Sequence, residues 1–176
     1  DEFSERLIQE TTDIIAEDVK LEKPFLNVFK IHSDSYVQET TSGGARYTSV
    51  NKAIFDALEV GAIVVNYFGH GGEDGIARER IFDKIDATEL LNKNKLNCFV
   101  SVTCEFTKFD NPNRETAGEF LYWNKNGGAI GLITTTRQIF VSVGVDFNIK
   151  YFDKIYGYIC NGSVSPRVFF QMLFRI

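Results

Sequence analysis

The chain has 176 residues, of which 44% are hydrophobic and 14% aromatic. A chain of this length can fold as one domain that buries about 68–70% of its unfolded surface. Its net charge is −5 and it has no basic stripe to neutralise phosphates, which argues against a nucleic-acid partner. No apolar run approaches the ~20 residues that a membrane-spanning helix needs. The three cysteines show no CxxC spacing, so neither a zinc site nor a redox dithiol is indicated.

The first part of the chain predicts helices and strands in alternation. Apolar residues recur at helical spacing near the start, and Pro24 prevents that helix from continuing. Ser49 is a candidate N-cap for a second helix whose Ile54, Phe55 and Leu58 face inward. In chain order the pattern predicts a helix at 3–20, a strand at 25–31, a polar surface loop at 32–48, a helix at 49–58 and a strand at 62–68.

The second part of the chain continues the alternation. Asp86-Ala87-Thr88-Glu89 resembles a capping box that opens a short helix, and Asn126-Gly127-Gly128 is a plausible helix C-cap. The predicted elements are a helix at 86–91, a strand at 96–102, a helix at 116–124, a strand at 129–134, a helix face at 147–155 and a last segment at 166–176 that starts with proline in its first turn.

Alternation of this kind predicts an α/β fold with a mostly parallel central sheet and helices on both faces. We expect residues 1–176 to form a single domain. Because the chain opens with a helix, we also expect one strand of the sheet to lie upstream of residue 1, so that the chain is a fragment of a larger protein, truncated at its N-terminus.

Two of the predicted strands stop abruptly at a reactive side chain. The run at 62–68 leads to His70, which stands among glycines, and the run at 96–102 leads to Cys104. The carboxyl ends of parallel strands meet at one edge of a sheet, where ligands and chemistry collect. A thiol and an imidazole at that edge form the minimal machinery of a cysteine peptidase. The N–H groups of Gly71 and its neighbour can face an oxyanion.

Each of these residues also has a simpler explanation. A solitary Gly-His-Gly is more often a turn with a solvated histidine, and a free cysteine ending a strand is more often a small buried residue. We apply that explanation to Cys98 and Cys160, whereas the matching positions of His70 and Cys104 favour a catalytic pair. Glu73 and Asp74 beside His70 supply too few ligands for a catalytic metal, and we expect no cofactor.

The segments after the two later strands are candidates for substrate binding. The polar stretch that begins at Glu105 can fold over a cleft. Thr135, Thr136 and Arg137 follow the strand at 129–134, so the same sheet geometry places them beside Cys104. A plain strand-to-helix connector explains these three residues about equally well.

The residues around His70 and Cys104 resemble the gingipain-type cysteine peptidases, which have a caspase-like fold. Asn66-Tyr67-Phe68-Gly69-His70-Gly71-Gly72 and Thr103-Cys104 carry this resemblance. A narrower resemblance is to the sortases of the bacterial type IX secretion system, and it covers residues 70–77, 79–82, 103–112, 117–119, 123–124, 126–132 and 134–137.

The resemblance implies a caspase-like three-layer sandwich and a specific chemistry. It makes Cys104 the nucleophile and His70 the general base, and it assigns the oxyanion hole to the N–H groups of Gly71 and Cys104. In this family the acid that orients the histidine comes from the strand before the first helix, which we expect upstream of residue 1.

The resemblance also implies a biological role. Such a sortase removes the C-terminal secretion signal from cargo proteins through a thioester, and it can transfer the cargo to an amine of lipopolysaccharide. Its partners would be the cargo polypeptide and other secretion components, at the outer face of the bacterial outer membrane.

Two other interpretations stay open. The chain can be a non-catalytic caspase-like module that binds secretion signals or partner proteins. It can also be an unrelated α/β protein that binds a small ligand at Gly69–Gly72 and has an inert thiol. The reactivity of Cys104 distinguishes the peptidase from both.

Overall fold

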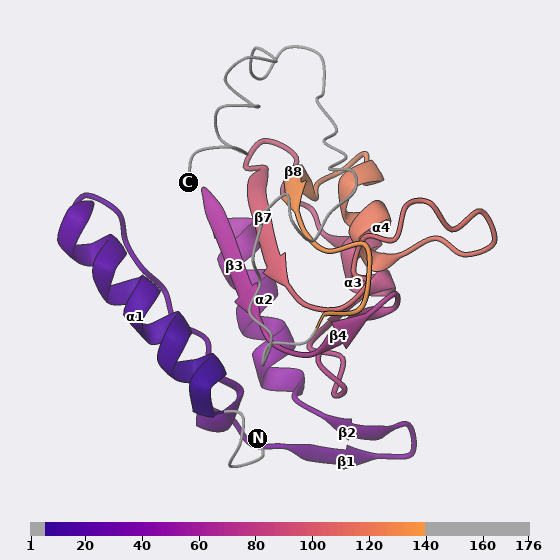
Figure 1. Ribbon diagram of the computed structural model, residues 1–176, viewed down its shortest axis with the longest axis horizontal. Coiled ribbons are helices and arrows are strands. Elements are labelled where there is room, and N and C mark those ends of the chain that lie inside the picture. The colour runs from indigo at the N-terminus through magenta and orange to yellow at the C-terminus, as the bar shows by residue number, and fades with distance from the viewer. Residues whose placement is uncertain (1–5, 140–176) are drawn as a thin grey trace. The chain divides into compact units, whose positions relative to one another are not determined.

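The computed structural model describes residues 6–139 (Figure 1). The chain divides into two compact units, Asp1–Phe140 and Val141–Ile176, and all described residues belong to the first. The predicted helix at 147–155, the segment at 166–176 and Cys160 lie outside the described residues. A single domain over 1–176 stays a prediction.

A three-stranded parallel sheet forms the centre of the described unit (Figure 1). Its strands are β3 (Val64–Phe68), β7 (Asn97–Val102) and β8 (Ala129–Ile133), in the order β3-β7-β8. Both neighbouring pairs are parallel. The predicted strands at 62–68, 96–102 and 129–134 are therefore confirmed, and so is the mixed α/β class with a parallel sheet and helices.

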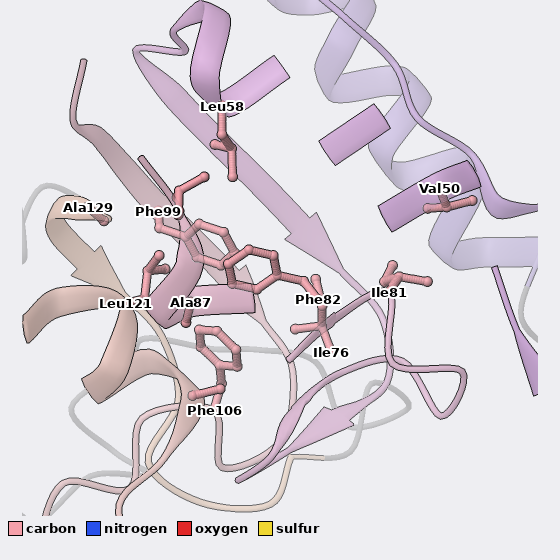
Figure 2. Packing of buried hydrophobic residues seen from close by; sticks show 12 residues of the cluster. Val50, Leu58, Ile76, Ile81, Phe82, Ala87, Phe99, Phe106, Leu121 and Ala129 are labelled. Carbon is pink, nitrogen blue, oxygen red and sulfur yellow. The ribbon is translucent and has the colours of Figure 1, made fainter. Parts of the chain in front are cut away.

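One face of this sheet carries the hydrophobic core (Figure 2). The strand β7 alternates strictly, so that Asn97, Phe99 and Ser101 are buried while the residues between them are half-buried. The ring of Phe99 stacks on Phe106 at 5.5 Å and on Phe82 at 6.2 Å between ring centroids. Burying side chains of this size stabilises the fold by about 1.5–3 kcal/mol each.

Three helices contribute to the same core. They are α2 (Thr48–Val60), α3 (Lys84–Glu89) and α4 (Ala117–Trp123). Figure 2 shows Leu58, Ala87 and Leu121 of these helices around Phe99. The predicted inward face of the second helix is confirmed, because Leu58 is buried and Ile54 and Phe55 pack against the cluster.

The N-terminal helix α1 (Arg6–Glu22) confirms the amphipathic helix predicted at 3–20, and Ala16 is its buried residue. The strand predicted at 25–31 is wrong, since no strand of the described chain includes these residues. Phe25 and Phe29 are 78% and 71% exposed, and Lys30 instead pairs with Asp13 and Glu17 of α1 at 2.7 and 3.1 Å. Neither α1 nor any other helix within 6–139 is long and apolar enough to cross a membrane.

The region predicted as a loop at 32–48 contains regular structure. A 3₁₀ turn at Ser33–Ser35 precedes a hairpin of β1 (Glu39–Thr41) and β2 (Gly44–Arg46). Its turn depends on Gly44, whose φ of +106° favours glycine, and on the Thr41 hydroxyl, which donates to the Gly44 carbonyl at 2.8 Å. The polar composition concealed this hairpin because both of its strands are mostly exposed.

Two helix starts differ from the prediction. The helix α2 begins at Thr48 after the N-cap Tyr47, so Ser49 is not its cap. The capping box of α3 lies three residues earlier than predicted: Asp83 is the N-cap and accepts from Ile85 N at 2.8 Å, while Asp86 accepts from Asp83 N at 2.8 Å. The helix predicted at 116–124 is confirmed by α4.

A small antiparallel sheet, not predicted from the sequence, follows β3. It consists of β4 (Gly71–Gly72), β5 (Gly75–Ile76) and β6 (Phe82–Asp83) in the order β4-β5-β6. Strands of two residues are too short to show an alternating pattern. This sheet matters because β4 starts directly after His70.

Candidate active site

The parallel register brings the ends of β3 and β7 together. Phe68 pairs with Val102, and the Gly69 N–H donates to the Val102 carbonyl at 3.2 Å. His70 and Cys104 each follow two residues after this last pair. The structure therefore places both predicted catalytic residues at the same carboxyl edge of the sheet, as the sequence pattern led us to expect.

The main chain of His70 is fixed from two sides. Its carbonyl accepts hydrogen bonds from the Tyr67 hydroxyl and from the Ala77 N–H, each at 2.7 Å. The side chain of His70 is exposed. Its role as general base towards Cys104 stays a prediction.

The N–H of Gly71 points away from the β4–β5 pairing. Ala77 donates to His70, so these two residues form a hydrogen-bonded pair of the antiparallel ladder. Such pairs alternate with non-hydrogen-bonded ones, and Gly71 opposite Ile76 is the next pair along. The Gly71 N–H is thus directed away from β5, and its role in an oxyanion hole stays a prediction.

Gly71 also lies directly against the strand that carries Cys104. A Cβ at this position would be 2.5 Å from the Thr103 hydroxyl oxygen and 3.0 Å from the Gly75 carbonyl. Thr103 is itself buried. The absence of a side chain at Gly71 therefore permits the close approach of the His70 hairpin to the residue before Cys104.

Cys104 is half-buried at the end of β7. Its Sγ lies 3.5 Å from the Ile139 nitrogen, which donates to it. The next residue, Glu105, has a φ of +50°, a left-handed conformation that is uncommon for residues other than glycine. Backbone outliers of this kind cluster at active sites, where the surrounding structure maintains them.

Three of the four predicted substrate-binding residues make main-chain contacts beside Cys104. The Glu105 N–H donates to the Arg137 carbonyl at 3.2 Å. Thr135 accepts from Thr107 N at 3.3 Å through its carbonyl, and its hydroxyl donates to the Thr103 carbonyl. The segment after β8 therefore runs alongside the Cys104 turn, as predicted.

The side chains of the predicted substrate-binding residues make different contacts. Glu105 binds Lys108 at 2.7 Å, and Arg137 forms two bonds to Asp110, at 2.9 and 2.5 Å. Thr136 is half-buried, and its carbonyl accepts from the Arg137 guanidinium at 2.8 Å. Contact of these residues with substrate stays a prediction.

A network of ion pairs lies beside the site and was not predicted from the sequence. Glu73 pairs with Lys108 and with Arg114, each at 3.2 Å. Asp74 pairs with Arg114 at 2.5 Å and with Lys84 at 2.8 Å. Glu73 and Asp74 are thus partners of cations, although the sequence suggested them only as weak metal candidates. The sequence shows opposite charges in the segments after His70 and Cys104, but it does not show which of them pair.

These pairings shift several pKa values in the direction that favours the charged forms. The hydrogen bond from Lys84, followed by that from Arg114, lowers the pKa of Asp74. Glu105 and then Glu73 raise the pKa of Lys108. The Arg137 guanidinium lowers the pKa of Asp110. Burial, in contrast, raises the pKa of the Cys98 thiol, which disfavours its thiolate form.

No group of three or more His, Cys, Asp or Glu side chains within the described chain could hold a metal ion. The arrangement brings a thiol and an imidazole to one edge of the sheet, which are the residue types that a cysteine peptidase uses. These features define a candidate cysteine peptidase.

Comparison with known proteins defines the family. The sequence model of peptidase family C25 matches residues 1–168. The chain therefore belongs to peptidase family C25, the gingipain-type cysteine peptidases, which confirms the broader of the two resemblances. No curated protein matches the chain.

Two solved structures resemble part of the chain. One is described only as a protease, with 23% identity and a TM-score of 0.46 over 50% of this chain. The other is the complex of the pro- and mature domains of RgpB from Porphyromonas gingivalis, with 27% identity and a TM-score of 0.46 over 50% of this chain. The matched parts are only 19% and 21% of those chains.

Proposed function

We propose that the chain carries the catalytic Cys–His pair of a cysteine peptidase, with Cys104 as nucleophile and His70 as general base. The observation that supports this most directly is the pairing of Phe68 with Val102, which aligns the two strands that end at these residues. Membership in peptidase family C25 supports the same chemistry.

In the proposed mechanism His70 takes the proton of the Cys104 thiol, and the thiolate attacks the scissile carbonyl carbon. The N–H groups of Gly71 and Cys104 stabilise the oxyanion that develops on the carbonyl oxygen. His70 then gives its proton to the leaving amine as the C–N bond breaks. Water or an acceptor amine attacks the resulting thioester and releases Cys104.

The pair is tested by the rate at which iodoacetamide labels each cysteine as a function of pH, measured by peptide mass spectrometry. We expect Cys104 to react much faster than Cys98 below about pH 7, because an adjacent imidazole favours the thiolate. The His70→Ala variant should lose this advantage, whereas Cys98→Ala should leave Cys104 unchanged. Slow labelling of Cys104 in the unchanged protein would favour the non-catalytic module.

We further propose that this peptidase acts as a sortase of type IX secretion, of the PorU kind. It would cleave the C-terminal signal from cargo proteins at the bacterial cell surface and could transfer them to a lipopolysaccharide amine. This proposal is supported by the sequence resemblance in 70–77, 79–82 and 103–112.

The sortase proposal is tested with peptides that carry a type IX signal, in the presence and absence of a primary amine. We expect cleavage that depends on Cys104, and an amide product when the amine is present, because both nucleophiles attack one thioester. Cleavage of general peptides without preference for the signal would contradict the sortase role and leave the peptidase intact.

A further inference from the structure

The turn that follows His70 is tied to the loop that follows Cys104 by charged side chains. Glu73 lies in the β4–β5 turn, and its side chain is only 15% exposed. One of its carboxylate oxygens lies 3.2 Å from the ammonium of Lys108, and the other lies 3.2 Å from Nε of Arg114. Both cations belong to the segment between β7 and α4, so Glu73 connects two loops that are distant in sequence.

Lys108 extends this connection to the residue next to the nucleophile. Its ammonium lies 2.7 Å from the carboxylate of Glu105. Glu105 directly follows Cys104 and has the left-handed φ of +50°. One ammonium therefore joins the hairpin of His70 to the turn of Cys104. Such a bridge favours the strained Glu105 conformation, because rotation of this residue would break the pair.

Main-chain hydrogen bonds fix the same two loops to one helix end. The Ala117 N–H donates to the Glu73 carbonyl at 2.8 Å, and the Gly118 N–H donates to the Phe106 carbonyl at 3.0 Å. A Cβ on Gly118 would be 2.8 Å from that same carbonyl, so the contact is as close as a glycine allows. The first turn of α4 thus fixes the spacing between the hairpin and the Cys104 loop.

The β4–β5 hairpin after His70 needs contacts with neighbouring loops because its own residues provide little side-chain packing. The strand β4 consists of two glycines, which contribute no side chains to packing and lose much backbone entropy on folding. A catalytic pair, however, works only when its groups are held within about 0.5 Å of the productive geometry. The partly buried carboxylate of Glu73 is well placed to supply this constraint.

We propose that Glu73 is a positioning residue, which through Lys108 and Glu105 fixes the His70 hairpin relative to Cys104. This inference rests on the proposed peptidase function and adds to it a residue that does not touch substrate. It predicts that loss of the Glu73–Lys108 pair changes the thiolate–imidazole pairing more than it changes folding.

The experiment compares the pH profile of Cys104 labelling in five forms of the full chain. These are the unchanged protein, Glu73→Gln, Lys108→Gln, the double variant and Lys84→Gln. The last is the matched control, because it breaks the Lys84–Asp74 pair in the same turn and leaves the path from Glu73 to Glu105 intact. Cys98 serves as the internal reference for folding in every sample.

We expect Glu73→Gln and Lys108→Gln each to slow Cys104 labelling about tenfold near pH 6.5, and to have little effect near pH 9, where the thiolate forms without help from His70. The double variant should lose less than the two single effects combined, since both substitutions break the Glu73–Lys108 pair, although Glu73→Gln also loses Arg114 and Lys108→Gln also loses Glu105. Lys84→Gln should stay within about twofold of the unchanged protein.

Three results would overturn the inference. The first is an unchanged pH profile of Cys104 labelling in Glu73→Gln. The second is a double variant in which the two decreases in labelling rate add in full, and the third is a decrease in Lys84→Gln as large as that in Glu73→Gln. If Glu73→Gln unfolds, shown by fast labelling of Cys98, the more exposed Lys108→Gln variant decides. Slow labelling of Cys104 in the unchanged protein would refute the peptidase function and this role with it, whereas fast labelling there and in Glu73→Gln refutes only this role.

Discussion

At Gly71 the backbone of the His70 hairpin touches the strand of Cys104. A methyl group there would lie 2.5 Å from the Thr103 hydroxyl oxygen and 3.0 Å from the Gly75 carbonyl, so one of these neighbours must move. We expect Gly71→Ala to lower the free energy of unfolding by about 1–3 kcal/mol, as is usual for overpacking. It should also slow Cys104 labelling, because the same shift displaces His70. Urea unfolding and the labelling assay measure the two effects.

Gly72 provides the control for this substitution. A Cβ at Gly72 would meet no heavy atom within 4 Å, and the residue has no left-handed φ. Gly72→Ala should therefore change stability by no more than about 0.5 kcal/mol, as for other surface substitutions. Equal losses in the two variants would show that flexibility of the hairpin, and not its contact with Thr103, determines its stability.

The sequence predicted the placement of His70 and Cys104 because each follows a mainly apolar strand, and the edge of a parallel sheet brings such positions together. It could not predict the Glu73–Lys108 pair in the same way. That pair depends on the register of a two-residue hairpin and on the path of a loop, neither of which leaves a periodic pattern. Ion pairs between loops can be identified only when the conformation of both loops is known.

At the scale of elements, the first turn of α4 is the common anchor of both catalytic loops. Glu119 lies inside this turn, is buried, and accepts from the Thr116 N–H and hydroxyl, each at 2.7 Å. We expect Glu119→Ala to reduce the free energy of unfolding by about 1–3 kcal/mol, because it leaves two buried donors without a partner. Because Ala117 and Gly118 hold the two loops, Cys104 labelling should slow as well.

Glu119→Gln is the conservative comparison. Its amide oxygen can still accept from Thr116, so it should lose only the interaction of the charge with the helix dipole, about 0.3–1 kcal/mol. Thermal unfolding of both variants, monitored by circular dichroism, measures the difference. A loss in Glu119→Gln as large as that in Glu119→Ala would assign the role of this residue to its charge and not to its hydrogen bonds.

The elements that the sequence predicted best are those with a buried face. The strands at 62–68, 96–102 and 129–134 are mainly apolar runs, and α4 begins with a capping box. The segment at 25–31 has similar composition, yet it forms no strand and its Phe25 and Phe29 are exposed, so strand propensity alone did not determine its structure. The start of α3 was misplaced because Asp83 and Asp86 are both good N-caps, and only the fold chooses between them.

At the scale of the whole described unit, acidic residues are paired with cations near the site, although the chain carries a net charge of −5. The pKa of Asp74 is lowered by Lys84 and then by Arg114, and the pKa of Asp110 is lowered by Arg137. A carboxylate whose pKa is lower in the folded state stabilises the fold at pH values above its unfolded pKa. This contribution is lost as the pH falls through the folded pKa, below the ordinary value of 3.8.

We therefore expect stability to decline on acidification below about pH 4, as the pairs of Asp74 with Lys84 and Arg114 and of Asp110 with Arg137 are lost. The double variant Asp74→Asn/Asp110→Asn should have a lower urea midpoint than the unchanged protein at neutral pH. Its midpoint should fall less below about pH 4, because the two amides do not titrate there. Added salt should reduce the difference, since both aspartates are about half exposed. Asp56→Asn, which removes the exposed Lys52–Asp56 pair of α2, is the control for general charge effects. If the double variant and the unchanged protein decline in parallel, these two pairs do not stabilise the loops of the site, and acid acts on the described unit elsewhere.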